Sequence, residues 1–140
     1  MNSLRRVHLV LPREPHAELL AAQAVDRIGL PLGFSRDTLS EVKLAVVEAC
    51  LNAMEYSGGA VEVELLGFAE DPARLEVSVM DHGPGFDPNA VPAPRLHEKL
   101  KAGRKRGWGL ALIRRLMDEV DIESRPGQTR LRMTRWAGGD

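Results

Sequence analysis

The sequence contains little of what marks several specialised classes of protein. It has a single cysteine, Cys50, so no disulfide can form within the chain. Basic and acidic side chains nearly cancel at 19 against 20, whereas nucleic-acid-binding proteins usually carry a basic excess. No apolar run approaches the ~20 residues that a membrane-spanning helix needs. We therefore expect a cytoplasmic protein that contacts neither nucleic acid nor membrane, since one unpaired cysteine fits a reducing compartment.

Three common ligand-binding motifs are also missing. The chain has no Gly-x-x-x-x-Gly-Lys-Ser/Thr run, which excludes a P-loop. Its glycine-rich pieces lack the Rossmann pattern and the strand that should precede it. The histidines have no metal-ligand spacing with cysteine, so a zinc site is not indicated.

The hydrophobic pattern predicts an α+β fold. A length of 140 residues favours one domain, residues 1–140, with enough chain for a core of its own. Apolar spacings of three and four predict helices over residues 14–28, 36–55 and 110–118. Alternation and turn residues predict strands over residues 7–11, 61–65, 75–80, 120–123 and 129–135. The expected architecture is a two-layer sandwich whose mixed, mostly antiparallel sheet carries the helices on one face.

The first polar patch lies on the second expected helix. Glu48 and Asn52 are four residues apart and therefore lie one above the other on one helix face. An amide oxygen is a suitable ligand for Mg²⁺, and a carboxylate can act as a general base on a hydroxyl group. Taken alone, two polar residues on a helix also fit an ordinary solvated face.

The second patch, Asp81-His82-Gly83-Pro84-Gly85, follows an expected strand. A carboxylate at a strand end can accept a hydrogen bond from an exocyclic amine such as that of adenine. Gly83 and Gly85 would let a ligand approach the backbone closely. Alone, the patch also fits a simple turn.

The third patch, Arg106-Gly107-Trp108-Gly109-Leu110, precedes the last expected helix. Free N–H groups at a helix N-terminus favour an anion such as phosphate, although a flexible loop and helix cap would look the same. Residues 89–106 before it are polar and read as a long mobile loop with late basic residues. Arg106 is the best candidate in this run to reach a phosphate.

Together, and in this order, the three patches resemble the N, G1 and G2 boxes of the GHKL (Bergerat-fold) ATPase superfamily. The resemblance covers roughly residues 7–136. The small size and the run from Gly107 to Val120 are similar to the anti-sigma factor serine/threonine kinases of the RsbW/SpoIIAB type. Tyr56, where that branch often has His, and Gln128, where it often has Gly, depart from its pattern.

The resemblance implies ATP and Mg²⁺ as ligands and a role for each matched residue. Asn52 would hold Mg²⁺ and Glu48 would be the catalytic base. The adenine side would be formed by Asp81, Gly83, Gly85 and Thr129. The phosphates would be cradled by the backbone amides of Gly107, Trp108, Gly109 and Leu110.

The implied partners are a STAS-domain anti-sigma antagonist as phospho-acceptor, a sigma factor held inactive, and a second copy of the chain in a homodimer. Two other functions stay open at this point. One is a module that binds ATP and sequesters a partner without transferring phosphate, against which Glu48 argues because binding alone needs no base. The other is a detached histidine-kinase catalytic domain, although the chain lacks a dimerisation helix with a phospho-accepting histidine.

Overall fold

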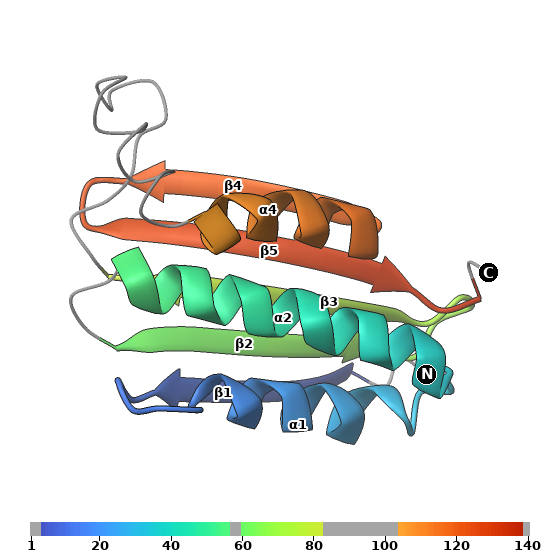
Figure 1. Ribbon diagram of the computed structural model, residues 1–140. Coiled ribbons are helices and arrows are strands. Elements are labelled where there is room, and N and C mark those ends of the chain that lie inside the picture. The colour runs from blue at the N-terminus through green and yellow to red at the C-terminus, as the bar shows by residue number, and fades with distance from the viewer. Residues whose placement is uncertain (1–3, 57–59, 83–103, 139–140) are drawn as a thin grey trace.

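The computed structural model describes residues 4–56, 60–82 and 104–138, and for Tyr56 and residues 104–108 it describes the backbone alone. These residues form a five-stranded sheet with three helices packed on one face (Figure 1). The strands are β1 (Leu4–Leu11), β2 (Val61–Phe68), β3 (Arg74–Asp81), β4 (Glu119–Arg125) and β5 (Gln128–Trp136). The helices are α1 (Glu18–Gly29), α2 (Arg36–Tyr56) and α4 (Arg104–Leu116). The predicted two-layer α+β architecture is thus confirmed.

The sheet has the strand order β1-β2-β3-β5-β4, and each neighbouring pair of described strands is antiparallel. The predicted mixed, mostly antiparallel sheet is thus antiparallel at every strand pair of the described residues. Successive side chains of a strand point to opposite faces. Val61, Val63 and Leu65 accordingly lie buried under the helices, while Glu62 and Glu64 occupy the open face.

Helix α2 lies in the middle of the helix layer, against α1, α4 and the central strands. Its predicted apolar stripe is buried as expected, with no member more than 7% exposed: Leu39, Val42, Val46, Ala49 and Ala53. Ser35 caps the start of α2, because the Thr38 N–H donates to Ser35 Oγ at 3.1 Å. Because the stripe packs into the core and the cap sets where α2 begins, the polar side chains of α2 lie on its remaining face.

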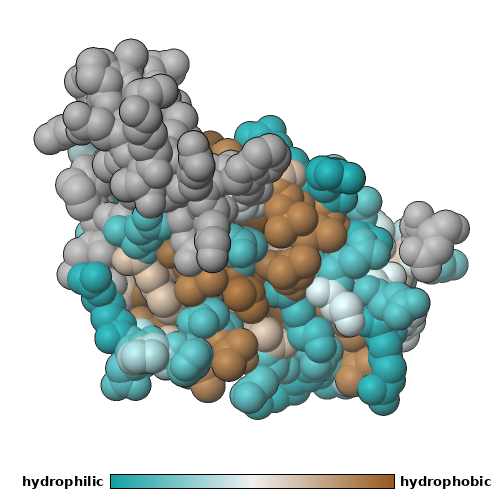
Figure 2. All heavy atoms as spheres, viewed as in Figure 1, coloured by the Kyte–Doolittle hydropathy of each residue, from teal (hydrophilic) through white to brown (hydrophobic). Residues whose placement is uncertain are grey.

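The surface of the helix layer carries apolar side chains between charged ones (Figure 2). Exposed leucines on these helices include Leu19, Leu20 and Leu44. Scattered apolar surface of this kind is ordinary in folded proteins. None of the described helices has the length and apolar character to cross a bilayer.

Two helices begin at residues well away from those that the sequence predicts. Helix α1 begins at Glu18 instead of residue 14, because residues 12–17 form turns with backbone hydrogen bonds from Glu14 to Pro12 and from Ala17 to Glu14. Helix α4 begins at Arg104, six residues before the expected Leu110, and ends at Leu116. Glycine costs only about 1 kcal/mol in a helix interior, so Gly107 and Gly109 do not prevent an early start.

Candidate functional site

The polar residues of α2 lie directly against α4. Glu48 and Asn52 are half-buried on the α2 face that meets Gly109. A Cβ atom at position 109 would lie 2.8 Å from Glu48 Oε2 and 3.2 Å from Asn52 Nδ2. A side chain at position 109 would therefore force these polar groups to move. The structure thus brings together one member of the third sequence patch and both members of the first.

The side-chain oxygen of Asn52 has an unusual environment. Asn52 Oδ1 is buried and accepts no hydrogen bond from any residue that the structure describes. Most buried polar atoms are paired, and leaving one unpaired costs about 1–3 kcal/mol. A ligand that supplies a partner for this oxygen would recover that free energy.

A hard divalent cation fits this oxygen chemically. Mg²⁺ takes oxygen ligands, keeps several waters and is usually held by one or two protein groups together with substrate phosphates. No cluster of three or more His, Cys, Asp or Glu ligands occurs among the described residues. The donor set thus fits Mg²⁺ bound together with a phosphate and does not fit a metal held by protein ligands alone.

Asp81 and Thr129 meet at the same end of the molecule. They are opposite each other in the β3–β5 ladder, and Asp81 is also opposite Val61 at the start of β2. Because α2 ends shortly before β2 begins, its C-terminal half and the end of β3 lie at one edge of the fold (Figure 1). Asp81 is only 6% exposed and faces the helix layer. A carboxylate at this position can accept hydrogen bonds.

Sequence reasoning missed Ser124 at this edge. Its Oγ lies 3.2 Å from Thr129 Oγ1, across the β4–β5 hairpin. The only sequence signal for this pair is the Pro126-Gly127 turn, which sets the register between the two strands; Gly127 has a positive φ of 86°. Ser124 therefore fixes the hydroxyl that faces Asp81 from the neighbouring strand.

The remaining candidates of the second and third patches are described only in part. Gly83 and Gly85 lie outside the described residues, as do residues 89–103 of the expected loop. The backbones of Arg106, Gly107 and Trp108 lie in the first turns of α4, and their side chains are not described. Leu110 follows in the same helix and is half-buried.

The early start of α4 changes which of its amides are available. Only the first four N–H groups of a helix have no intrahelical acceptor. With α4 beginning at Arg104, the last of these belongs to Arg106, because the N–H of the fourth helical residue already bonds to the carbonyl of the capping residue, as that of Leu39 does to Ser35 in α2. In this conformation the amides of Gly107, Trp108, Gly109 and Leu110, the predicted phosphate cradle, therefore fall where helical hydrogen bonds form.

Two neighbouring side chains stay out of the site. His82 follows Asp81 but points its Nε2 to Glu62 Oε1 at 3.1 Å, and His8 contacts the other carboxylate oxygen at 3.3 Å. These hydrogen bonds hold the pKa of Glu62 below its usual value. Cys50 is buried on the core side of α2, and burial raises the pKa of its thiol to about 12. Its thiol is therefore a packing group.

Comparison with known proteins places this arrangement in a family. The model of the histidine kinase-like ATPase domain matches residues 11–135. The chain is 32% identical to the serine-protein kinase RsbW of Bacillus velezensis and 30% identical to that of Bacillus subtilis, in each case over 99% of this chain and 90% of the relative. The chain therefore belongs to the histidine kinase-like ATPase family, and its relatives in that family include serine-protein kinases.

Solved structures agree on the fold. The RsbU and RsbW domains of a Mycobacterium tuberculosis protein match with a TM-score of 0.65 at 18% identity, over 95% of this chain and 33% of that one. The SiaB–SiaC complex of Pseudomonas aeruginosa matches with a TM-score of 0.57 at 14% identity, over 93% and 89%. At these identities the likeness supports the architecture alone.

Proposed function

We propose that this chain is an ATP-dependent protein serine/threonine kinase that acts as an anti-sigma factor. It would phosphorylate a STAS-domain antagonist protein and sequester a sigma factor. The observation that carries the proposal is the contact of Gly109 with Glu48 and Asn52, because it sets a carboxylate and an unpaired amide oxygen against the helix expected to bind phosphate.

ATP would bind along the edge where α2, α4, β3 and β5 meet. The Asp81 carboxylate would accept a hydrogen bond from the adenine amine, with Thr129 beside it and Gly83 and Gly85 shaping the pocket. The phosphates would lie at the N-terminal end of α4, where free amides and the helix dipole favour an anion. Gly107, Trp108, Gly109 and Leu110, in the turns that follow this end, are the proposed phosphate cradle, and Arg106 would add a positive charge.

Asn52 would hold Mg²⁺ through its side-chain oxygen. When bound, the ion would neutralise charge on the phosphates, which is a large part of what accelerates phosphoryl transfer. The Asn52 oxygen fits this role because it is a hard donor with no protein partner among the described residues.

Glu48 would act as the general base. Its carboxylate accepts the proton of a serine or threonine hydroxyl on the partner protein. The hydroxyl oxygen forms a bond to the γ-phosphorus as the bond from that phosphorus to the β,γ-bridging oxygen breaks, and ADP leaves. A base is needed for a hydroxyl acceptor, whereas an imidazole can attack unaided, and this difference favours serine or threonine over histidine.

The partners are proposed from similarity. Two relatives at 30–32% identity are named serine-protein kinases, and one structural neighbour was solved as a complex of SiaB with SiaC. A STAS-domain antagonist as acceptor, a sigma factor as second partner and a homodimer as the assembly follow from the resemblance to the RsbW/SpoIIAB branch.

The proposal is tested by phosphoryl transfer from radiolabelled ATP with Mg²⁺ to a purified STAS-domain protein. The expected product is a labelled acceptor that keeps its label in acid, as phosphoserine and phosphothreonine do. An acid-labile product would indicate a histidine acceptor and contradict the proposal. Nucleotide binding without transfer to any STAS-domain protein tried would favour a module that only sequesters its partner.

A further inference from the structure

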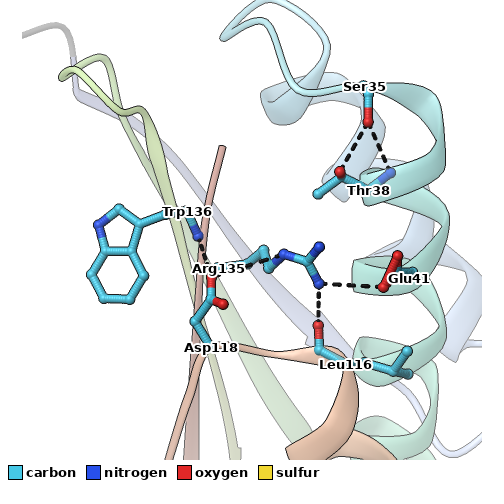
Figure 3. Close-up of polar contacts among 7 residues, drawn as sticks. All are labelled: Ser35, Thr38, Glu41, Leu116, Asp118, Arg135 and Trp136. Carbon is cyan, nitrogen blue, oxygen red and sulfur yellow. Dashed lines mark hydrogen bonds and ion pairs between the residues drawn. The ribbon is translucent and has the colours of Figure 1, made fainter. Parts of the chain in front are cut away.

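Arg135 lies under the helix layer at the end of the α2–α4 pair that is remote from Glu48. It is paired with the buried Leu75 in the β3–β5 ladder, so its side chain points toward the helices. Its Nη1 donates to the carbonyl oxygen of Leu116, the last residue of α4, and to Glu41 Oε2 of α2 at 3.4 Å (Figure 3). The Arg135 side chain is only 13% exposed. One guanidinium therefore connects β5, α2 and α4.

Asp118 strengthens the same junction. Its Oδ2 accepts the Trp136 N–H at 2.8 Å and lies 3.8 Å from Arg135 Nε. Its own N–H donates to the Thr134 carbonyl at 2.9 Å. A cation beside the last carbonyls of a helix also interacts favourably with the helix dipole. The C-terminal end of α4 is thus fixed to β5 by several directional contacts.

The spacing along the two helices links this junction to the site. Glu41 lies seven residues before Glu48 on α2, and Leu116 lies seven residues after Gly109 on α4. At 1.5 Å per residue each stretch spans about 10 Å. The two helices run antiparallel, so the Arg135 junction and the Gly109 contact lie at opposite ends of two stretches of equal length.

Polar contacts fix this alignment more sharply than apolar ones. Ile113 of α4 is fully buried between the two ends, but hydrophobic burial is non-directional and tolerates small sliding. An arginine fork has a rigid planar geometry and specifies where its acceptors lie. A displacement of α4 by one residue rise of about 1.5 Å would move Gly109 away from Glu48 and Asn52.

We propose that Arg135 is a positioning residue that sets the axial register of α4 against α2 and thereby holds Gly109 at Glu48 and Asn52. Arg135 touches no part of the site itself and acts through the length of α4. The expected effect of Arg135 on nucleotide binding rests on the proposed function. The expected effect of Arg135 on the position of α4 does not, because it can be measured without nucleotide.

The test compares Arg135→Gln with Arg74→Gln. Arg74 is a matched control: it contacts two carboxylates, Glu70 and Glu76, is 23% exposed and lies on the opposite face of the sheet. Both variants lose an arginine with two acidic partners, so both should lower the melting temperature. The affinity for Mg²⁺·ATP is measured by calorimetry, and hydrogen exchange of the α4 amides from Gly109 to Ile113 is measured without nucleotide.

We expect Arg135→Gln to weaken Mg²⁺·ATP binding by about tenfold, equivalent to about 1.4 kcal/mol, and to speed hydrogen exchange of the amides of residues 109–113. Arg74→Gln should change neither quantity. Arg135→Lys keeps the charge without the fork and should fall between wild type and Arg135→Gln. If Arg135→Gln does not fold, Glu41→Gln removes the 47% exposed partner of the same junction and should show the same pattern at smaller amplitude.

Wild-type exchange in these amides of a folded Arg135→Gln variant would overturn the inference. Equal effects of Arg135→Gln and Arg74→Gln for the same loss of melting temperature would also overturn it, because the role of Arg135 would then be structural only. If the wild-type protein binds no Mg²⁺·ATP, the proposed function fails. The hydrogen-exchange comparison then tests by itself whether Arg135 sets the position of α4 against α2.

Discussion

The two ends of the α2–α4 pair are both polar, but they differ in how their polar groups are paired. At one end Arg135 of β5 contacts Glu41 of α2, the Leu116 carbonyl of α4 and Asp118. At the other end Asn52 Oδ1 is buried without a partner among the described residues. The paired end stabilises the fold. Leaving the Asn52 oxygen unpaired lowers the stability of the fold. Binding of a ligand that supplies the missing partner gives a physical reason why this oxygen is buried there.

This contrast predicts that substitutions at the two ends will differ in their effects on stability and on function. Changes at the Arg135 end should lower stability first and affect the site through the position of α4. Changes at Glu48, Asn52 and Gly109 should reduce binding or catalysis with little loss of stability.

Replacing Glu48 by Gln should have the largest effect on activity. The amide keeps the shape of the side chain but cannot accept the proton, and general-base catalysis contributes about 10²–10⁴-fold to rates. We expect a loss of that order in single-turnover phosphoryl transfer, with Mg²⁺·ATP affinity close to that of wild type. Glu55→Gln on the same helix is the matched control, because Glu55 is an exposed glutamate of α2 that is assigned no part in the chemistry. Equal rates for Glu48→Gln and wild type would remove Glu48 from the chemistry.

Replacing Gly109 by Ala should separate stability from function. The added Cβ meets Glu48 Oε2 and Asn52 Nδ2, so these side chains must shift. Alanine is also favoured over glycine in a helix by about 0.5–1 kcal/mol. We expect unchanged or increased stability in urea together with Mg²⁺·ATP binding that is weaker by about tenfold, or 1.4 kcal/mol. A variant that is less stable in urea but binds Mg²⁺·ATP as tightly as wild type would contradict this prediction, because the added Cβ would then have disturbed the packing and not the site.

Replacing Glu62 by Gln should have the smallest effect and should depend on pH. The folded-state pKa of Glu62 is lowered from 4.5 by hydrogen bonds from His8 and His82. Its carboxylate therefore contributes stability above pH 4.5, and that contribution is lost as the pH falls through the lower folded-state value. The cluster is exposed, so we expect at most about 1 kcal/mol. Urea unfolding of both proteins at pH 7 and at pH 3 measures it, and a difference that grows toward low pH would contradict this account.

Local features of the fold could be predicted from the sequence. The apolar stripe of α2, the Ser35 cap and the Pro126-Gly127 hairpin depend on residues within a few positions of one another, and all three are present. Their physical causes are helical periodicity, capping chemistry and the backbone freedom of glycine at positive φ. The predicted order of helices and strands followed from the same local signals.

The geometry of the site could not be predicted in this way. The sequence singled out Glu48, Asn52 and Gly109, but the contact between them depends on how α2 and α4 pack. The early start of α4 was missed because helix formation through two glycines depends on tertiary packing and not on propensity. The unpaired Asn52 oxygen and the Arg135 junction were missed for the same reason, since nothing local in the sequence indicates them. The roles of the site residues stay a prediction.

The most direct measurement of the central claim is a calorimetric titration with ATP, with and without Mg²⁺, of the wild-type protein and of Asn52→Ala. The account predicts that wild type binds ATP more tightly with Mg²⁺ and that the variant loses this Mg²⁺-dependent gain, about tenfold or more. The variant should remain at least as stable as wild type, because it removes an unpaired buried oxygen. A well-folded wild-type protein that binds no ATP, or a variant that keeps the full Mg²⁺-dependent gain, would contradict the account.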